Sequence, residues 1–137
     1  MTAVLDTAAT AVVFRAARQD KPWGYEVIFA AGEAGYVGKV IHVTAGQALS
    51  LQYHEQKVET ISVLHGECVV EHGTSVDALT HRTMFPGDTI HLPAFTVHRI
   101  TAVTDLAFVE ASTAGTGWRE DVVRLEDKYG RTGTNAP

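Results

Sequence analysis

Short stretches of β-prone residues alternate with turn residues along most of the chain. Val, Ile, Thr, Phe and Tyr are frequent in these stretches, and turn signals recur about every 8–12 residues. In KVIHVT (39–44), alternation places Lys39, Ile41 and Val43 on one face of a strand and the other three side chains on the opposite face. This spacing predicts an all-β sandwich or barrel.

The turn residues set the limits of the expected strands. Strands are predicted at 23–30, 36–44, 49–53, 59–72 with a break at Gly66, 81–85, 89–93, 97–103 and 106–112. Residues 118–131, WREDVVRLEDKYGR, are the only stretch with a helical alternative, and a strand followed by a turn fits them equally well.

The length of 137 residues fits a single domain. Residues 1–20 are expected to form an N-terminal arm or an edge strand, and residues 21–131 to form the folded domain. Residues 132–137 lack apolar spacing and are expected to be a flexible tail. An apolar arm can pair with an exposed sheet edge of a second copy, so a homodimer is expected.

Charge and cysteine content narrow the class of protein. The net charge of -5 disfavours nucleic acid and anionic membranes as partners, but it leaves room for a local basic pocket that binds an anionic small molecule. No apolar run reaches the roughly 18–20 residues that span a bilayer, and the N-terminus lacks the basic start of a secretory signal. Cys68 is the single cysteine, which suits a reducing, cytoplasmic location, and we expect it to be a small buried hydrophobe.

Two stretches carry side chains that suit a metal ion. Gln52 and His54 are two residues apart, so both leave the same face of a strand, and Glu59 is close enough to return on the neighbouring strand. His98 comes from the second stretch, 86–101. Oxygen and imidazole donors that converge inside a barrel suit one divalent transition metal: Zn, Mn, Fe, Co or Ni.

Each of these residues also has a structural interpretation. His54 and His98 could be hydrogen-bonded core histidines, and Gln52 could bind a neighbouring loop. Glu59 heads a largely apolar run, so if it points inward its carboxylate needs a partner, for which a cation is expected. The remaining histidines have no motif around them and are expected at the surface or in strand packing: His42, His65, His72, His81 and His91.

The spacing of the two stretches resembles the two motifs of the cupin superfamily. In the first motif, five residues separate Gly46 from Gln52-x-His54, and four residues separate His54 from Glu59. Six further residues lead to Gly66, which ends this motif. In the second motif, five residues separate Gly87 from Pro93, and His98 falls at the motif's His position. The resemblance implies a single-domain double-stranded β-helix, the cupin jelly roll.

A finer resemblance points to the cupin domain of type II mannose-6-phosphate isomerases. It rests on KPWGYEVI (21–28), on LSLQYH (49–54), where Gln stands for the first His of the general motif, and on REDVVRLEDKYGR (119–131). The resemblance implies that Gln52, His54, Glu59 and His98 are the metal ligands. It also implies interconversion of mannose 6-phosphate and fructose 6-phosphate, by analogy.

The sequence departs from that family around the expected ligands. The family usually has further His and then Arg-Ala-Glu-His-Trp where residues 55–61 read EQKVETI. Phe95 stands where the second motif has Gly, and we expect this bulky side chain to fill space that a substrate would use. The Asn usual shortly after the final His is absent.

The favoured hypothesis is a metal-dependent isomerase of a sugar or sugar phosphate, working by proton transfer through an enediol. Candidates for the catalytic group are Glu55, Lys39 and Arg124, and candidates to bind an anionic substrate are Lys57, Arg99 and Arg124. Two alternatives stay open. One is another metal-dependent cupin enzyme, such as an epimerase, lyase or oxygenase, and the other is a non-catalytic cupin that binds a small ligand.

Overall fold

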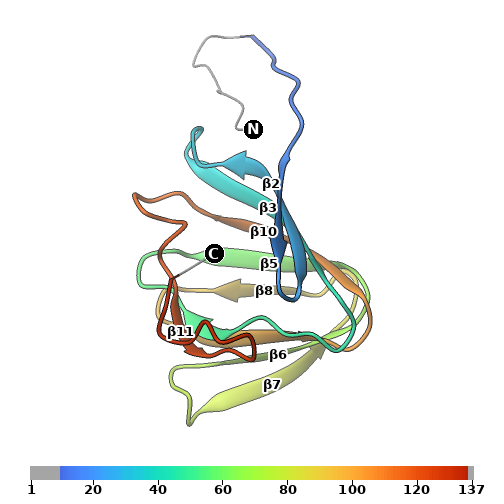
Figure 1. Ribbon diagram of the computed structural model, residues 1–137, viewed down its shortest axis with the longest axis vertical. Helices are drawn as coiled ribbons and strands as arrows, with labels where there is room; N and C mark the ends of the chain where they lie inside the picture. Colours follow the sequence, from blue (N-terminus) through green and yellow to red (C-terminus); the bar gives the residue numbers. More distant parts are fainter. Residues whose placement is uncertain (1–9, 136–137) are drawn as a thin grey trace.

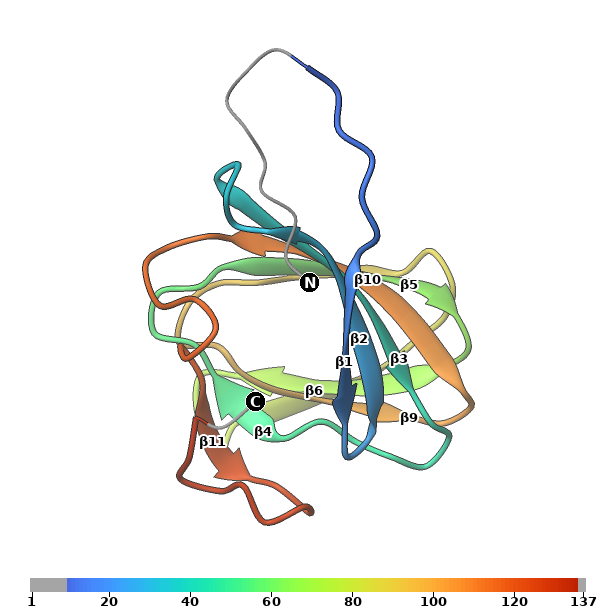
Figure 2. The same ribbon diagram turned by 45° about the horizontal axis from the view of Figure 1, so that its top comes forward.

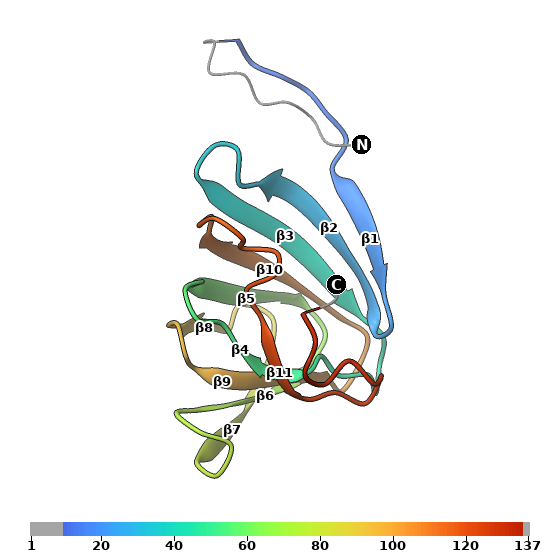
Figure 3. The same ribbon diagram turned by 60° about the vertical axis from the view of Figure 1, so that its left-hand side comes forward.

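The computed structural model describes residues 10–135. Within them, strands form two antiparallel sheets that face each other, and residues 10–16 extend away from the sheets (Figures 1 and 3). The strands are β1 Ala17–Lys21, β2 Gly24–Ala31, β3 Tyr36–Val43, β4 Leu51–Tyr53, β5 Glu59–His65, β6 Cys68–Gly73, β7 Leu79–Met84, β8 Thr89–Leu92, β9 Val97–Ala102, β10 Leu106–Thr113 and β11 Val123–Glu126.

The pairing of the strands is nested. β3 pairs with β10, β4 with β9, β5 with β8, and β6 with β7, all antiparallel, so the chain is folded as one long hairpin whose turn lies between β6 and β7. The hairpin is wound so that its pairs alternate between a sheet of order β1-β2-β3-β10-β5-β8 and a sheet of order β11-β4-β9-β6-β7 (Figure 2). This is the predicted jelly roll.

The space between the sheets is apolar at one end and charged at the other. Along β10, Leu106, Phe108 and Glu110 are buried and alternate with more accessible residues, as the pleat requires. β5 runs antiparallel beside it and buries Val63, Ile61 and then Glu59. Both inward strands therefore change from apolar side chains to a carboxylate at the same end of the barrel.

Several local expectations can be compared with these strands. Lys39, Ile41 and Val43 share a face as predicted, since Ile41 and Val43 are buried and Lys39 lines a cavity beside Ile41. Residues 118–131 contain turns and β11 rather than a helix, so the alternative of a strand with turns is the correct one. Residues 10–135 include no helix long and apolar enough to cross a membrane.

At the termini, the observations are partial. β1 is the edge strand of its sheet and runs to residue 21, whereas residues 1–9 lie outside the described part of the chain. In the predicted tail, Thr134 accepts a hydrogen bond from Arg124 through its backbone oxygen, and residues 136–137 lie outside the described part. The domain limits and the flexibility of the tail stay predictions.

Gly66, the last glycine of the first motif, is required by the β5–β6 turn. Its φ is +85°, in the left-handed region, and a Cβ added there would lie 2.1 Å from the carbonyl oxygen of Asp105. Gly87, the first glycine of the second motif, has a similar φ of +92°, but nothing lies within 4 Å of an added Cβ. Both positions therefore need a residue that tolerates a positive φ, and only Gly66 also lacks space for a side chain.

Gly66→Ala should therefore cost more than Gly87→Ala. For Gly87→Ala we expect a loss of about 1–2 kcal/mol in the free energy of unfolding from backbone strain alone. For Gly66→Ala the collision with Asp105 adds to that loss. Urea denaturation at pH 7 measures both, and equal losses would show that the β5–β6 turn relaxes without difficulty.

Candidate metal centre

The charged end of the barrel brings together three buried side chains from three segments. Glu59 begins β5, His98 lies on β9, and His54 directly follows β4. Each offers a nitrogen or oxygen atom, and these atoms lie within 4.8 Å of one another. The relative exposures of the three residues are 6% for His54, 3% for Glu59 and 4% for His98.

Backbone carbonyls orient both imidazole rings. The Nδ1 of His98 lies 2.9 Å from the carbonyl oxygen of Thr96, and the Nδ1 of His54 contacts that of Asp121. A carbonyl only accepts hydrogen bonds, so each Nδ1 carries a proton, and Nε2 is the ring atom that faces Glu59. The two Nε2 atoms lie 3.0 Å (His98) and 3.5 Å (His54) from Oε1 of Glu59.

This arrangement fits a metal ion. The Nε2 of His54 is buried and has no hydrogen-bond partner in the described structure, although it lies near Glu59. Buried polar atoms are rarely left unpaired, and a coordinated cation would satisfy this one. Two imidazoles that are oriented by backbone carbonyls and lie beside a carboxylate suit Zn, Mn, Fe, Co or Ni. This set of donor atoms does not select among these metals.

Gln52, the fourth predicted ligand, sits beside this group. It pairs directly with His98 across the β4–β9 ladder and lines the same cavity. Its Oε1 accepts a hydrogen bond from the hydroxyl of Ser50, which leaves a second lone pair on that oxygen. The assignment of Gln52 as a ligand stays a prediction.

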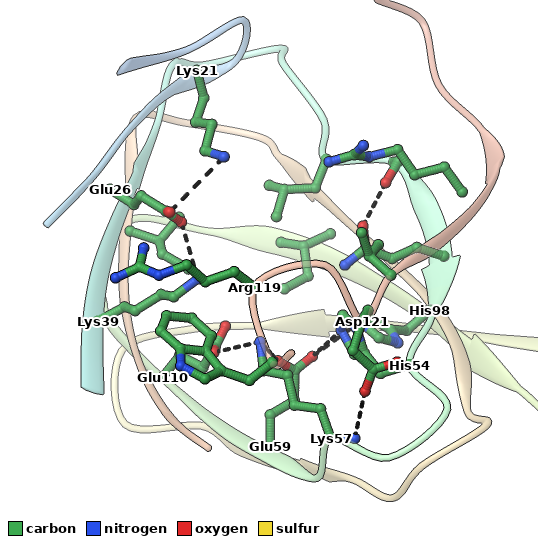
Figure 4. Close-up of a pocket in the computed structure, with 18 of the residues that line it drawn as sticks. Lys21, Glu26, Lys39, His54, Lys57, Glu59, His98, Glu110, Arg119 and Asp121 are labelled. Carbon is green, nitrogen blue, oxygen red and sulfur yellow. Dashed lines mark hydrogen bonds and ion pairs between the residues drawn. The ribbon is translucent and has the colours of Figure 1, made fainter. Parts of the chain in front are cut away.

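Lys57 joins this group to a second buried carboxylate. Its ammonium lies 3.3 Å from Oε2 of Glu59 and 2.9 Å from Oε2 of Glu110 (Figure 4). Ser112 donates to the same Glu110 oxygen at 3.0 Å. The sequence predicted a cation beside Glu59, and within the protein that cation is Lys57. The alternation of β10 was the signal that could have revealed Glu110, because it lies in phase with Leu106 and Phe108.

The charges in this network fix one another's ionisation. Burial by itself lowers the pKa of Lys57, but Glu110 and Glu59 outweigh it and raise the pKa above its ordinary value. Burial alone would raise the pKa of Glu59, whereas the adjacent imidazoles of His54 and His98 and the charge of Lys57 hold it well below the ordinary range. Glu59 is therefore an anion and Lys57 a cation at neutral pH.

Asp121 fastens the segment that carries His54 and Lys57. Its carboxylate accepts hydrogen bonds from the backbone N–H groups of Glu55, Gln56 and Lys57 at 2.8, 3.0 and 2.8 Å, while its own carbonyl oxygen orients His54. Burial tends to raise the pKa of Asp121, but the amides outweigh it and lower the pKa. Apart from its place in residues 119–131, Asp121 had no separate signal in the sequence.

The site faces a cavity of about 250 Å³. In Figure 4, Lys21, Glu26 and Lys39 lie on one side of this cavity and His54 and His98 on the other. A family model described as "Mannose-6-phosphate isomerase C-terminal" matches residues 10–127. The chain belongs to this family.

Curated relatives of this family are longer proteins. The xanthan biosynthesis protein XanB of Xanthomonas campestris pv. campestris is 32% identical over 114 residues, which cover 82% of the chain and 23% of XanB. The alginate biosynthesis protein AlgA of Pseudomonas putida is 31% identical over a match that covers 83% of the chain and 23% of AlgA. Mannose-1-phosphate guanylyltransferase ManC of Salmonella typhimurium is 31% identical over 81% of the chain and 22% of ManC. The chain thus spans less than a quarter of the length of these relatives.

Solved structures confirm the fold. The capsular polysaccharide assembling protein CapF of Staphylococcus aureus matches with a TM-score of 0.70 at 15% identity, over 84% of this chain and 33% of CapF. Oxalate decarboxylase of Bacillus subtilis matches with a TM-score of 0.71 at 16% identity, over 80% and 30%. Both are cupins, so this mannose-6-phosphate isomerase C-terminal domain has the cupin jelly roll predicted from its motifs.

Only some of the remaining candidate residues of this family domain line the cavity. Lys39, Lys57 and Arg124 line the cavity, whereas Glu55 is exposed and is not among the lining residues. Arg99 also lies away from the cavity, where it binds Glu71 through two nitrogens at 2.8 and 3.0 Å and Glu126 at 3.3 Å.

The expectation that Phe95 fills the cavity is wrong. Phe95 is 59% exposed, is absent from the cavity lining and stacks on Tyr53 at 6.0 Å. Its φ of +64° explains why the motif has glycine at this position. Its N–H donates to the carbonyl of His54 at 2.7 Å, so Phe95 holds this turn while its ring points outward.

The remaining predicted structural residues are absent from the lining of the cavity beside the metal centre. His42 stacks on Tyr25 at 4.4 Å, and His91 contacts the hydroxyl of Thr60. Cys68 is buried, and burial together with Asp88 and Glu67 raises the pKa of its thiol to about 11. It is therefore a small core residue, as predicted, with little thiolate at neutral pH.

We expect His54→Ala and His98→Ala each to lose bound metal while the barrel stays folded, because the core lies at the other end of the sheets. His91→Ala is the matched control, since His91 is exposed on β8. Elemental analysis of protein purified without added metal should give about one transition metal per chain for wild type and for the control. Normal metal content in both site variants would contradict the assignment.

Asp121→Ala should loosen the segment that carries His54 and lower metal affinity about 10–100-fold. It should also lower the free energy of unfolding at pH 7 by about 1–2 kcal/mol. Folding lowers the pKa of Asp121, so its carboxylate stabilises the folded state at pH values above its ordinary pKa of 3.8. This stabilisation is lost as the pH falls through the lower pKa that Asp121 has in the folded state. The difference in the free energy of unfolding between wild type and Asp121→Ala should therefore shrink at low pH. Asp77→Ala, in the exposed β6–β7 turn, is the control for both metal titration and urea denaturation.

Proposed function

We propose that the chain is a metal-dependent isomerase that interconverts an aldose phosphate and a ketose phosphate, with mannose 6-phosphate as the first substrate to test. The observation that carries this proposal is that His54, Glu59 and His98 open on the same cavity as the buried pair Lys57 and Glu110. Donors for a Lewis acid and groups for proton transfer thus share one enclosed space, which is what enediol chemistry requires. Membership of the isomerase family supports the same assignment.

The metal, when bound by His54, Glu59, His98 and Gln52, would polarise the substrate's carbonyl oxygen and acidify the adjacent C–H bond. The chain then has to move one proton between neighbouring carbons. Among the described residues, both polar contacts of Glu110 fall on Oε2, so Oε1 is the oxygen available as a base.

In this mechanism Glu110 takes the proton from the carbon next to the carbonyl, which leaves an enediolate, and returns it to the former carbonyl carbon. The hydroxyl proton of the neighbouring carbon passes to the former carbonyl oxygen, so that the second carbon becomes the new carbonyl and no proton is lost or gained over the cycle. The ammonium of Lys57 lies beside both carboxylates and stabilises negative charge that develops on the substrate oxygens. Glu110 replaces Glu55 as the proposed base, because Glu55 does not line the cavity.

Other features are consistent with catalysis rather than with simple ligand binding. The exposed position of Phe95 leaves the cavity open, and the donor atoms around the metal centre all face it. An epimerase or lyase would use the same proton abstraction, so these remain the alternative reactions. A homodimer paired through the edge strand β1 and a cytoplasmic location belong to the same proposal.

The test is incorporation of solvent deuterium into mannose 6-phosphate, followed by mass spectrometry. Wild type should incorporate deuterium, and Glu110→Gln should reduce the rate about 100-fold or more with metal content unchanged. Glu120→Gln, an exposed carboxylate at the same cavity, should exchange at the wild-type rate.

Two outcomes would contradict the proposal. Full exchange in Glu110→Gln would remove Glu110 as the base. Absence of exchange by metal-loaded wild type with mannose 6-phosphate and with a panel of other sugars and sugar phosphates would reject isomerisation.

A further inference from the structure

Arg124 is a buried cation that the proposed proton chemistry does not use. It lies on β11 directly opposite Gln52 of β4, lines the cavity and is 8% exposed. One of its terminal nitrogens donates to the backbone oxygen of Thr134 at 3.3 Å, while its Nε is buried and has no hydrogen-bond partner in the described structure. A buried guanidinium donor without an acceptor is costly unless a ligand supplies one.

Asp127, the acid whose charge acts on Arg124, is already engaged. Asp127 binds Arg131 through Nε at 2.9 Å and through a terminal nitrogen at 3.1 Å, and it also accepts the backbone N–H of Arg131. Burial and the positive charge of Arg131 lower the pKa of Arg124, and Asp127 offsets this only in part. Two guanidinium groups therefore share one carboxylate.

Lys21 brings a third positive charge to the same region. Burial lowers its pKa, Glu26 opposes this, and the positive charges of Lys39, Arg131 and Arg124 lower it further. All four of these cationic side chains line the same cavity. Glu26 is itself shared, since it lies 3.9 Å from the ammonium of Lys21 and 3.4 Å from that of Lys39. Figure 4 shows Lys21 on the side of the cavity opposite His54 and His98.

We propose that Lys21, Arg124 and Arg131 form an anion subsite that binds a phosphate monoester. The inference deepens the proposed function, because it assigns the phosphate end of the substrate to residues of this chain. Planar guanidinium groups suit phosphate through paired N–H donors, and the orphaned Nε of Arg124 supplies such a donor. The positive excess is local, in a chain of net charge -5.

The position of Arg124 relates this subsite to the metal centre. Gln52 stands between them, since it pairs with Arg124 on one side and with His98 on the other in the order β11-β4-β9. A ligand bound by its phosphate at Arg124 therefore extends along Gln52 toward the metal ligands. The anion subsite and the candidate metal ligands therefore lie along one cavity.

Isothermal titration of the protein as purified with inorganic phosphate tests the subsite. Wild type should bind phosphate, and Arg124→Gln should weaken binding about tenfold or more with metal content unchanged. Arg99→Gln removes the same charge on the outer face of β9 and should bind as wild type does. If Arg124→Gln does not fold, Lys21→Gln takes its place with the same expectation.

Further titrations identify the ligand and its location. Mannose 6-phosphate should bind more tightly than inorganic phosphate. Mannose should bind more weakly than mannose 6-phosphate, by about the same factor by which Arg124→Gln weakens the binding of phosphate. Phosphate binding that survives Arg124→Gln but is lost in His98→Ala would place the anion at the metal and overturn the inference. Absence of phosphate binding to wild type at tens of millimolar would also overturn it.

The two proposals can fail separately. Phosphate binding that depends on Arg124, in a protein that catalyses no deuterium exchange, supports the subsite and rejects the isomerase. Exchange in wild type that is unaffected by Arg124→Gln in both rate and KM keeps the isomerase and rejects the subsite.

Discussion

The carboxylate of Glu59 is the group on which the charged end of the barrel depends. It is almost fully buried and faces two imidazole nitrogens through one oxygen and an ammonium through the other. A carboxylate in that position without such partners would take up a proton or destabilise the fold. The surrounding positive and metal-binding groups are therefore a condition for folding as well as for chemistry.

The same constraint explains the layout of the cavity. Lys57 neutralises Glu59 only in part, because it also binds Glu110, which draws a second carboxylate and Ser112 into the network. On the other side of the cavity, cationic side chains outnumber the acids that contact them. The candidate metal ligands and a group of cationic side chains therefore line one cavity.

Much of this was visible in the sequence because motif spacing reports backbone geometry. Gly66 marks a turn that only glycine fits, and His98 marks a strand position whose partner across the ladder is Gln52. The sequence could not show that Lys57 turns inward, because the direction of that side chain depends on three amide hydrogen bonds to Asp121. Phe95 was misjudged for a related reason, since its unusual φ directs the ring outward.

The contact between His54 and Asp121 joins residues 67 positions apart. The orientation of one candidate metal ligand is therefore set by a segment that follows β10 in the sequence, far from the ligand itself. The candidate metal centre thus reports how residues 119–124 are seated, although none of its expected ligands lies among them.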